Sequence, residues 1–217
     1  MKKAEKVIIA IIFAIAFALI INNVIAKINE PNANMKLAEA KKEIVEKTLE
    51  KNIEEIIFVP EIPHVEISDV KISKDMNLTE RTGLLKEDFV ELINRLKTDK
   101  SGFFRDNAEK IYDLCEQYSI NEIFFCGLIA QESGWNIAAN HRRTNNFISL
   151  MSNGRLLSYS SVEEGLEVAA QKLHNNYLET TGKFYHGQTL SGVKVAFCPA
   201  SSTWIDAVYG RMKTILY

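Results

Sequence analysis

One carboxylate occupies an unusual position in this chain. Glu132 follows the segment IFFCGLIA (123–130) and Gln131, and that segment is apolar apart from one glycine. Burial beside apolar neighbours raises the pKa of a carboxyl group, and the negative end of a helix dipole acts in the same direction. A carboxylic acid that stays protonated near neutral pH can protonate the leaving oxygen of a glycosidic bond. Glu132 is therefore a candidate general acid, although a glutamate that reaches solvent or pairs with Arg142 or Arg143 fits the same position.

The composition gives little support to several other kinds of site. The chain has 217 residues and a net charge of -2, so no electrostatic signal indicates nucleic acid as a partner. The sequence contains no Gly-rich phosphate loop, no Cys-x-x-Cys pair and no His-x-x-x-His pair, and we expect neither a cofactor nor a metal. Cys115 and Cys126 fall on apolar helical faces, where cysteine serves as a small hydrophobe, and the odd count of three cysteines supports no disulfide.

The segment that carries Glu132 predicts a buried central helix. INEIFFCGLIAQES (120–133) leaves no polar face, so other elements must surround it. Gly134 is the residue expected to end this helix, because glycine tolerates the backbone conformation found there. The acid then lies in the last helical turn.

The surrounding elements are mostly helical. Apolar residues at spacings of three and four predict helices within 84–96, 104–118, 160–178 and 201–217. A turn at 152–154 between short apolar runs predicts one small β-hairpin. Glu163 and Glu164 follow serines at capping-box spacing, which favours a helix-capping role for both. The expected fold class is α+β, a mostly helical body with one small hairpin.

Residues 1–27 are predicted to form an N-terminal membrane helix. An apolar run from Val7 to Ile21 follows three lysines, and counting through Ala26 gives about 20 residues, enough to span a bilayer. The preceding lysines keep the N-terminus in the cytoplasm and place the remainder outside. The alternative is a cleavable signal peptide cut before Lys27. The first interpretation gives a single-pass protein of the cell membrane, the second a secreted one, and both place the domain on the extracytoplasmic side.

A stalk is expected over residues 28–82. Residues 35–57 predict a helix with an i, i+4 apolar stripe among many Lys and Glu, and its poor heptads favour a solvated spacer over a coiled coil. Residues 65–72 alternate after two prolines, which indicates an extended linker or an edge strand. The domain proper is expected over 83–217. Nothing in the sequence fixes the oligomeric state.

Four segments, taken in order, resemble one family of enzymes. They are QESGW (131–135), NNF (145–147), SYS (158–160) and AFCP (196–199), the last one ahead of Trp204. Together they resemble the bacterial endo-β-N-acetylglucosaminidases of glycoside hydrolase family 73, within the lysozyme-like superfamily. The resemblance implies a lysozyme-like α+β fold and cleavage of peptidoglycan glycan strands after N-acetylglucosamine. It also implies that Glu132 is the general acid.

The resemblance further indicates residues for substrate binding. Aromatic rings can stack on sugar faces or pack in the core, and an asparagine can bind a sugar hydroxyl or shape a turn. Phe197 keeps a ring where the family often has tyrosine, but it lacks the hydroxyl. The residues expected to bind the glycan are Gln131, Trp135, Asn146, Phe147, Tyr159 and Phe197.

The sequence departs from the family in its acidic residues. Many members carry a second acid in the hairpin lobe, whereas no Asp or Glu lies between Glu132 and Glu163 here. The sugar's own acetamido oxygen can replace it, or neutral groups such as Asn146 or Tyr159 can orient a water. A single carboxylate also fits a lytic transglycosylase, which forms a 1,6-anhydro product without water. A third interpretation is a catalytically inactive wall-binding protein.

Overall fold

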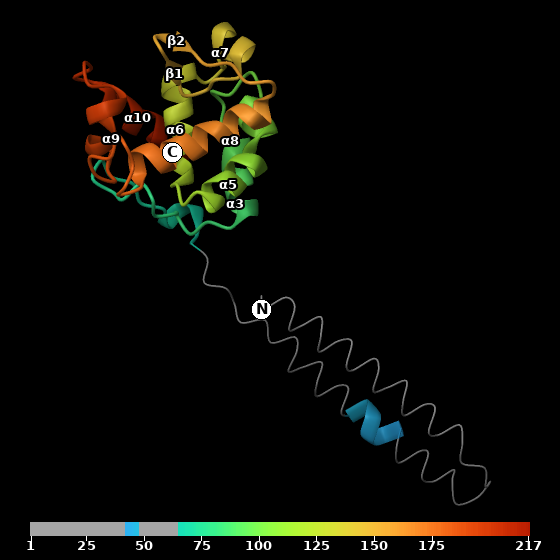
Figure 1. Ribbon diagram of the computed structural model, residues 1–217. Coiled ribbons are helices and arrows are strands. Elements are labelled where there is room, and N and C mark those ends of the chain that lie inside the picture. The colour runs from blue at the N-terminus through green and yellow to red at the C-terminus, as the bar shows by residue number, and fades with distance from the viewer. Residues whose placement is uncertain (1–41, 48–64) are drawn as a thin grey trace, which may run out of the picture. The chain divides into compact units, whose positions relative to one another are not determined.

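The structure is a computed structural model that describes residues 42–47 and 65–217 (Figure 1). The chain divides into two compact units, Met1–Pro63 and His64–Tyr217. Residues 42–47 are helical, as expected for this part of the predicted 35–57 helix. The remainder of that helix and the predicted membrane helix at 1–27 lie outside the described residues. Within the described ranges, no helix combines the length and the apolar character needed to cross a membrane.

The larger unit is a helical body with one two-stranded sheet (Figure 1). Its elements in chain order are η1 (Ile67–Asp69), α3 (Lys86–Asn94), α4 (Phe103–Asp106), α5 (Ala108–Gln117), α6 (Glu122–Ser133), α7 (Ala139–Thr144), β1 (Met151–Ser152), β2 (Arg155–Leu156), α8 (Val162–Leu173), the π-helical turn η2 (His174–Leu178), α9 (Leu190–Phe197) and α10 (Trp204–Leu216). The strands pair antiparallel as the predicted hairpin, with Met151 opposite Leu156. The expected mostly helical body with one small hairpin is confirmed.

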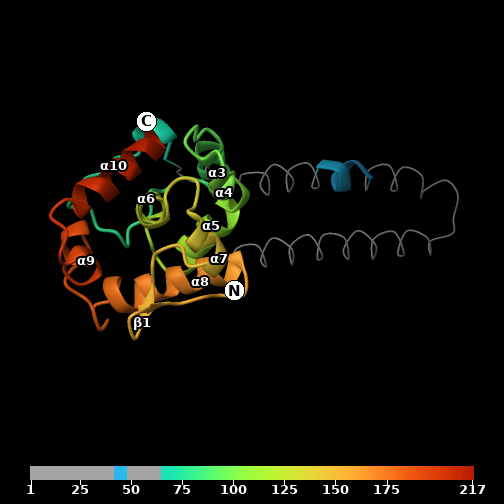
Figure 2. The same ribbon diagram turned by 90° about the horizontal axis from the view of Figure 1, so that it is seen from above.

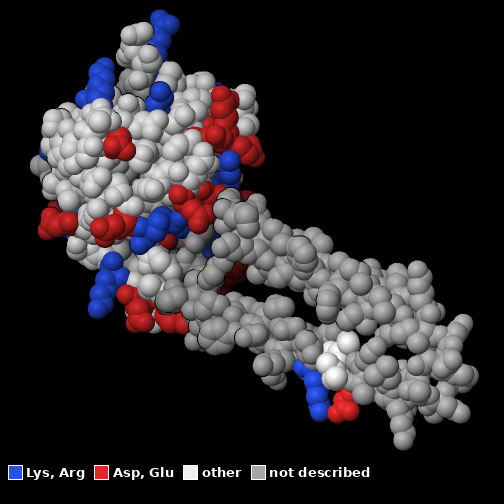
Figure 3. All heavy atoms as spheres, turned by 60° about the horizontal axis from the view of Figure 1, so that its bottom comes forward, with Lys and Arg blue, Asp and Glu red and all other residues white. Residues whose placement is uncertain are grey.

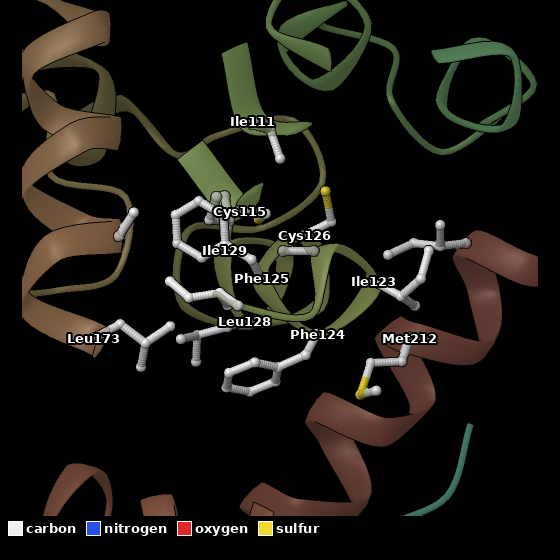
Figure 4. Close-up of a cluster of buried hydrophobic side chains, with 14 of the residues drawn as sticks. Ile111, Cys115, Ile123, Phe124, Phe125, Cys126, Leu128, Ile129, Leu173 and Met212 are labelled. Atoms are coloured by element: carbon white, nitrogen blue, oxygen red, sulfur yellow. The ribbon is translucent and has the colours of Figure 1, made fainter. Parts of the chain in front are cut away.

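α6 runs through the middle of this unit. Figure 2 looks along it, with α10, α9, α8, α5 and α3 arranged around it. Every residue from Glu122 to Ala130 is buried. Side chains of three neighbouring helices close over it, among them Cys115 of α5, Leu173 of α8 and Met212 of α10 (Figure 4). Gly127 lets α10 approach, since a Cβ there would lie 2.8 Å from the Cγ of Met212.

Both ends of α6 have identifiable causes. The Asn121 side-chain oxygen accepts a hydrogen bond of 3.0 Å from the backbone N–H of Phe124, which satisfies one free donor of the first turn. Gly134 ends the helix with φ 77° and ψ 159°, a conformation that glycine adopts without steric cost. The helix end predicted at Gly134 is thereby confirmed, and Glu132 lies in the last turn.

Residues 65–82 fold with the domain, which corrects the boundary expected at residue 83. The compact unit begins at His64. Leu78 is fully buried, and its backbone N–H donates to the carbonyl of Gln188 at 2.7 Å. The Leu78 carbonyl accepts from the backbone N–H of Asn121 at 2.8 Å. The apolar residues of this stretch pack on the domain around one 3-10 turn, η1, so it is neither a free linker nor an edge strand.

Charged side chains are mixed on the outside of the domain. On the face shown in Figure 3, Lys and Arg lie among Asp and Glu, and neither sign dominates it. This agrees with the small net charge of -2.

Candidate active site

The C-terminal end of α6 presents Glu132 to a tryptophan from another helix. Trp204 is the first residue of α10 and is only 3% exposed. Its indole Nε1–H donates a hydrogen bond of 3.0 Å to Oε1 of Glu132. The Ser149 side chain also acts on the Glu132 carboxyl group and lowers its pKa. Glu132 itself is only partly buried, so the group is held in place and still reaches the surface.

The surroundings of Glu132 favour its protonated form. Burial raises the pKa of Glu132 above the usual value for a glutamate. The hydrogen bond from Trp204, the positive field of His141 and the Ser149 side chain act in the opposite direction, because they stabilise the carboxylate. The net direction is upward, as the apolar sequence before Glu132 predicted. Such a group can carry a proton to a substrate at higher pH than an ordinary glutamate.

His141 belongs to this environment and was not among the predicted site residues. It lies on α7 and is 6% exposed. Its Nδ1 lies 2.6 Å from the carbonyl oxygen of Asn146. Since a carbonyl only accepts, Nδ1 carries the proton and donates it. The short helix α7 and the loop that follows it bring His141 and Ser149 toward Glu132. The sequence around His141, NHRRT, carries no signal for such a role.

Asn146 holds the hairpin loop. Its side-chain Nδ2 donates to the carbonyls of Leu150 at 2.8 Å and Leu157 at 3.0 Å, and its Oδ1 accepts from the Leu150 N–H at 2.9 Å. The residue is 1% exposed. Both amide protons are used by the backbone, so in this structure Asn146 shapes the loop, and the expected contact with a sugar or an oriented water is not open to it. Shaping the turn was the alternative that the sequence left open.

Phe147 also lies in the interior. It is 1% exposed, and its ring centre is 4.7 Å from that of Phe103. Its carbonyl accepts a hydrogen bond of 2.6 Å from the hydroxyl of Ser133 on α6. Phe147 therefore joins the loop after α7 to the end of α6, and in this structure it offers no face to a glycan.

Trp135 and Gln131 are the predicted residues that stay partly exposed next to Glu132. The Trp135 ring lies 5.5 Å from the ring of Phe104, edge to face. The guanidinium of Arg211 lies 5.8 Å from the Trp135 ring centre. Trp135 is thus held on two sides while part of it faces solvent.

A row of aromatic rings begins at Trp204, the residue that hydrogen-bonds to Glu132. Phe197 lies 5.6 Å from Trp204 and 5.4 Å from Tyr177, measured between ring centres. Tyr177 in turn lies 5.3 Å from Phe184. Phe197, Tyr177 and Phe184 are all partly exposed. The row connects Phe197, a predicted binding residue, to Tyr177 and Phe184, which were not predicted to bind the glycan. Tyr177 lies in η2, the continuation of α8, and Phe184 lies in the loop that follows.

Tyr159 is held by its backbone rather than by its hydroxyl. Its N–H donates to the Thr144 carbonyl at 2.8 Å, and its carbonyl accepts from Asn145 Nδ2 at 3.1 Å. The hydroxyl oxygen is buried and has no hydrogen-bond partner among the described residues. Burial, and secondarily the charge of Glu164, raises the pKa of Tyr159. The phenol therefore stays protonated, and its O–H can donate a hydrogen bond to a ligand or a water.

The two glutamates after the hairpin act as helix-capping residues. The Glu164 carboxylate accepts from the N–H and the hydroxyl of Ser160, and these contacts lower the pKa of Glu164. The Ser161 hydroxyl accepts from the Glu164 N–H at 3.1 Å, completing the start of α8. The Glu163 pKa is lowered by its own backbone N–H and by Ser161. Both carboxylates are committed to the helix start, as the capping interpretation predicted.

The described residues contain no cluster of three or more His, Cys, Asp or Glu side chains able to hold a metal ion. Cys115 and Cys126 are buried free thiols, and Cys198 is a partly exposed one.

Comparison with known proteins supports the fold. No protein-family model matches the chain, and no curated protein matches its sequence. Crystal structures of Staphylococcus aureus autolysin E share the fold. The enzyme alone aligns at 16% identity with a TM-score of 0.52, over 69% of this chain and 76% of its own.

Two complexes of the same protein align equally well. A catalytic mutant of autolysin E with the disaccharide NAG-NAM gives 15% identity and a TM-score of 0.52, over 67% of this chain and 74% of that one. The complex with the muropeptide NAM-L-Ala-D-iGlu gives 15% and 0.52, over 69% and 74%. At this identity the likeness establishes the fold alone, which this chain shares with autolysin E.

Proposed function

We propose that this protein is a peptidoglycan hydrolase, an endo-β-N-acetylglucosaminidase of glycoside hydrolase family 73, with Glu132 as its general acid. The observation that carries the proposal is the state of Glu132. It ends the buried central helix, burial raises its pKa, and Trp204 fixes one of its oxygens while the group stays accessible. The fold shared with autolysin E and the four sequence segments support the same reaction.

The first chemical step belongs to Glu132. Its carboxyl proton passes to the glycosidic oxygen as the bond from that oxygen to the anomeric carbon breaks. The resulting carboxylate is stabilised by the donors already in place, the Trp204 indole N–H and the Ser149 side chain. The same two donors that oppose a high pKa in the resting enzyme thus stabilise the ionised product of this step.

The sugar itself supplies the nucleophile in this proposal. Glu163 and Glu164 are held at the start of α8, and both amide protons of Asn146 are bonded to the backbone. The 2-acetamido oxygen of the cleaved N-acetylglucosamine attacks the anomeric carbon and forms a cyclic oxazolinium intermediate. Water then opens this ring and gives its proton to the Glu132 carboxylate, which restores the acid. The reaction consumes one water and retains the anomeric configuration.

The proposal includes the place where the enzyme acts. The apolar run at Val7–Ile21 supports a membrane tether with the catalytic domain on the extracytoplasmic side, where peptidoglycan lies. Cleavage before Lys27 would release the same domain in secreted form.

A lytic transglycosylase is the second candidate. The feature that favours it is the commitment of Glu163 and Glu164 to helix capping, which leaves Glu132 as the carboxylate of the site. In that reaction the muramyl 6-hydroxyl replaces water, and an anhydro end forms. The two activities differ in their products and can be separated directly.

The test is a digest of purified peptidoglycan with the full chain and with its Glu132→Gln variant. Gln keeps an oxygen that accepts from Trp204 but has no proton to transfer. New glycan ends are reduced with borohydride and identified by mass spectrometry. We expect reduced N-acetylglucosamine ends with the natural protein and a loss of rate of about 10²–10⁴-fold with the variant.

The other outcomes separate the alternatives. Anhydro-muramyl ends would assign the protein to the transglycosylases. Sacculus binding without new ends from either form would leave a catalytically inactive wall-binding protein. Undiminished cleavage by the Glu132→Gln variant would exclude Glu132 as the acid.

A further inference from the structure

A cation next to the acid has no role in the reaction proposed above. Arg211 lies on α10 and is partly buried. Its guanidinium carbon lies 5.8 Å from the centre of the Trp135 ring, within cation–π distance. Within the described part of the chain, no carboxylate lies at ion-pair distance from Arg211. A guanidinium held on a ring and partly withdrawn from water, yet unpaired, is suited to an anion from outside.

Trp135 fixes where this cation lies. The ring follows Glu132 by three residues, just past the helix-ending Gly134. Trp135 contacts the ring of Phe104 of α4 and the guanidinium of Arg211 of α10. Figure 2 shows α4 and α10 on opposite sides of α6. Trp135 therefore bridges the two helices at the end of α6 that carries the acid.

The position of Arg211 relative to Glu132 follows from the spacing of Trp204 and Arg211 on α10. Trp204, which binds Glu132, and Arg211 are seven residues apart on this helix and so lie on the same face. Seven residues correspond to about 10 Å along a helix axis. This offset between the two backbone positions favours a contact of Arg211 with a glycan unit next to the one whose bond is cleaved.

The chemistry of the pair selects the ligand. A guanidinium presents a planar fork of donors that matches a carboxylate, and an indole offers an apolar face to a sugar ring. Together they suit a sugar that carries a carboxylate-bearing substituent. The muramyl units of peptidoglycan have one, either the lactyl carboxylate of a peptide-free strand or a carboxylate of the stem peptide. Polymers of N-acetylglucosamine alone have none.

We propose that Trp135 and Arg211 form a subsite that binds a muramyl unit through its carboxylate and so selects peptidoglycan over uncharged N-acetylglucosamine polymers. This inference rests on the proposed function, since it assigns the substrate of the same site. Arg211 is the residue that determines specificity, and Trp135 orients it.

The test measures binding in the full-length Glu132→Gln background, where turnover does not interfere. Three ligands are titrated calorimetrically: an N-acetylglucosamine tetrasaccharide, a peptide-free N-acetylglucosamine–muramic acid tetrasaccharide, and the same strand with stem peptides. Each is compared in the Arg211→Gln and Arg211→Lys variants. Lys213→Gln removes the same charge from an exposed position of α10 and serves as the matched control. Thermal unfolding checks that all variants fold.

The preference for muramyl ligands is the Kd of the N-acetylglucosamine tetrasaccharide divided by the Kd of a muramyl ligand. We expect Arg211→Gln to reduce this ratio by about tenfold, which is the loss typical of one charge-assisted hydrogen bond. Arg211→Lys should recover part of it, and Lys213→Gln should leave the ratio unchanged. A change only with the peptide-free strand assigns the lactyl carboxylate, because stem peptides convert that carboxylate into an amide. A change only with the peptide-bearing strand assigns the stem peptide, and a change with both shows that Arg211 accepts either carboxylate.

An unchanged ratio in Arg211→Gln would overturn the subsite and leave the proposed function standing. An equal fall with Lys213→Gln would do the same, because it would show a general charge effect. Binding of none of the three ligands by the folded Glu132→Gln protein would remove the glycan-binding function and this inference with it.

Discussion

Trp204 Nε1 donates a hydrogen bond of 3.0 Å to Glu132 Oε1, although the two residues are 72 positions apart in the chain. The bond joins the last turn of α6 to the first residue of α10. It stabilises the carboxylate, and it opposes the burial that raises the pKa of Glu132. Because α10 provides this donor, the packing of α10 on α6 limits how far burial raises the pKa of Glu132.

Trp204→Phe tests this bond. The variant keeps most of the ring but loses the N–H, so the ionised form of Glu132 is less stable and its pKa rises further. A general acid works while protonated, and the falling limb of the pH profile of kcat should therefore move to higher pH, by about one unit for a bond of this kind. Trp135→Phe is the control, because the Trp135 indole makes no hydrogen bond to Glu132. A limb that stays in place in Trp204→Phe would contradict this assignment.

Glu132→Gln should change the pH dependence of stability as well as activity. The folded-state pKa of Glu132 is raised by burial, so its favourable share of stability is present below the ordinary carboxyl pKa of about 4.3 and is lost as pH rises through the folded-state pKa. Gln does not titrate. Urea unfolding should show the variant gaining stability relative to the natural protein from acid to neutral pH. Glu116→Gln, at an exposed site, controls for the loss of one negative charge.

Asn146→Ala should destabilise the loop before the hairpin. It removes three hydrogen bonds and leaves the Leu150 N–H and the Leu157 carbonyl without these partners, while the Leu150 carbonyl keeps its bond from the Leu157 N–H, at a cost of about 2 kcal/mol. Ser149 lies within this loop, so kcat should fall too. Denaturant unfolding and steady-state kinetics measure both effects. Unchanged stability with a raised KM would instead indicate the sugar contact expected from the sequence.

The ion pair at the start of α6 offers a stability test far from the acid. Arg81 Nε lies 2.7 Å from a carboxylate oxygen of Glu122, whose side chain is 0% exposed, and Thr82 donates to the same carboxylate. Arg81→Met leaves the buried Glu122 carboxylate without its cationic partner. The free energy of unfolding, measured with heat or urea, should therefore fall by about 3 kcal/mol. Removing both charges, in Arg81→Met/Glu122→Gln, should recover part of the loss. Equal stability of Arg81→Met and the natural protein would refute the pair's role.

The three cysteines should differ in reactivity. Burial raises the pKa of Cys115 and of Cys126, which suppresses the reactive thiolate. Cys198 is partly exposed at the end of α9. A thiol reagent should therefore modify Cys198 alone in the native protein and all three cysteines after unfolding. The Cys198→Ser variant should show no fast phase, and rapid labelling of that variant would contradict the prediction.

The sequence predicted the features that depend on neighbouring residues alone: the central helix, the hairpin and the helix caps. The apolar segment before Glu132 predicted a helix buried among other helices, and it predicted a raised pKa of Glu132. Both follow because a helix without a polar face must be buried. Ser152-Asn153-Gly154 predicted the hairpin, since Asn153 and Gly154 both adopt positive φ there. The capping residues of α8 were likewise readable from their spacing.

The remaining features depend on contacts that no local pattern encodes. The Trp204 donor reaches Glu132 only through the packing of α10 on α6. Asn146 has the same side chain whether it binds a sugar or three backbone groups, so its use here follows from the shape of the loop. The stretch before residue 83 indicates a linker or an edge strand because its residues alternate after two prolines, yet Leu78 is fully buried in the domain.

The segment 77–82 has a mechanical consequence. It is bonded to the start of α6 through Leu78 and Arg81, while Glu132 lies at the opposite end of a helix about 18 Å long. A pull that enters this domain at residue 65 would first load the contacts of residues 65–74, among them the Val65–Gly83 backbone bond and the Lys74–Asp206 ion pair, and only then the buried pair of Arg81 and Glu122. The contacts of Leu78 and Arg81 thus resist tension at the end of α6 opposite to Glu132, with the whole length of the helix between them.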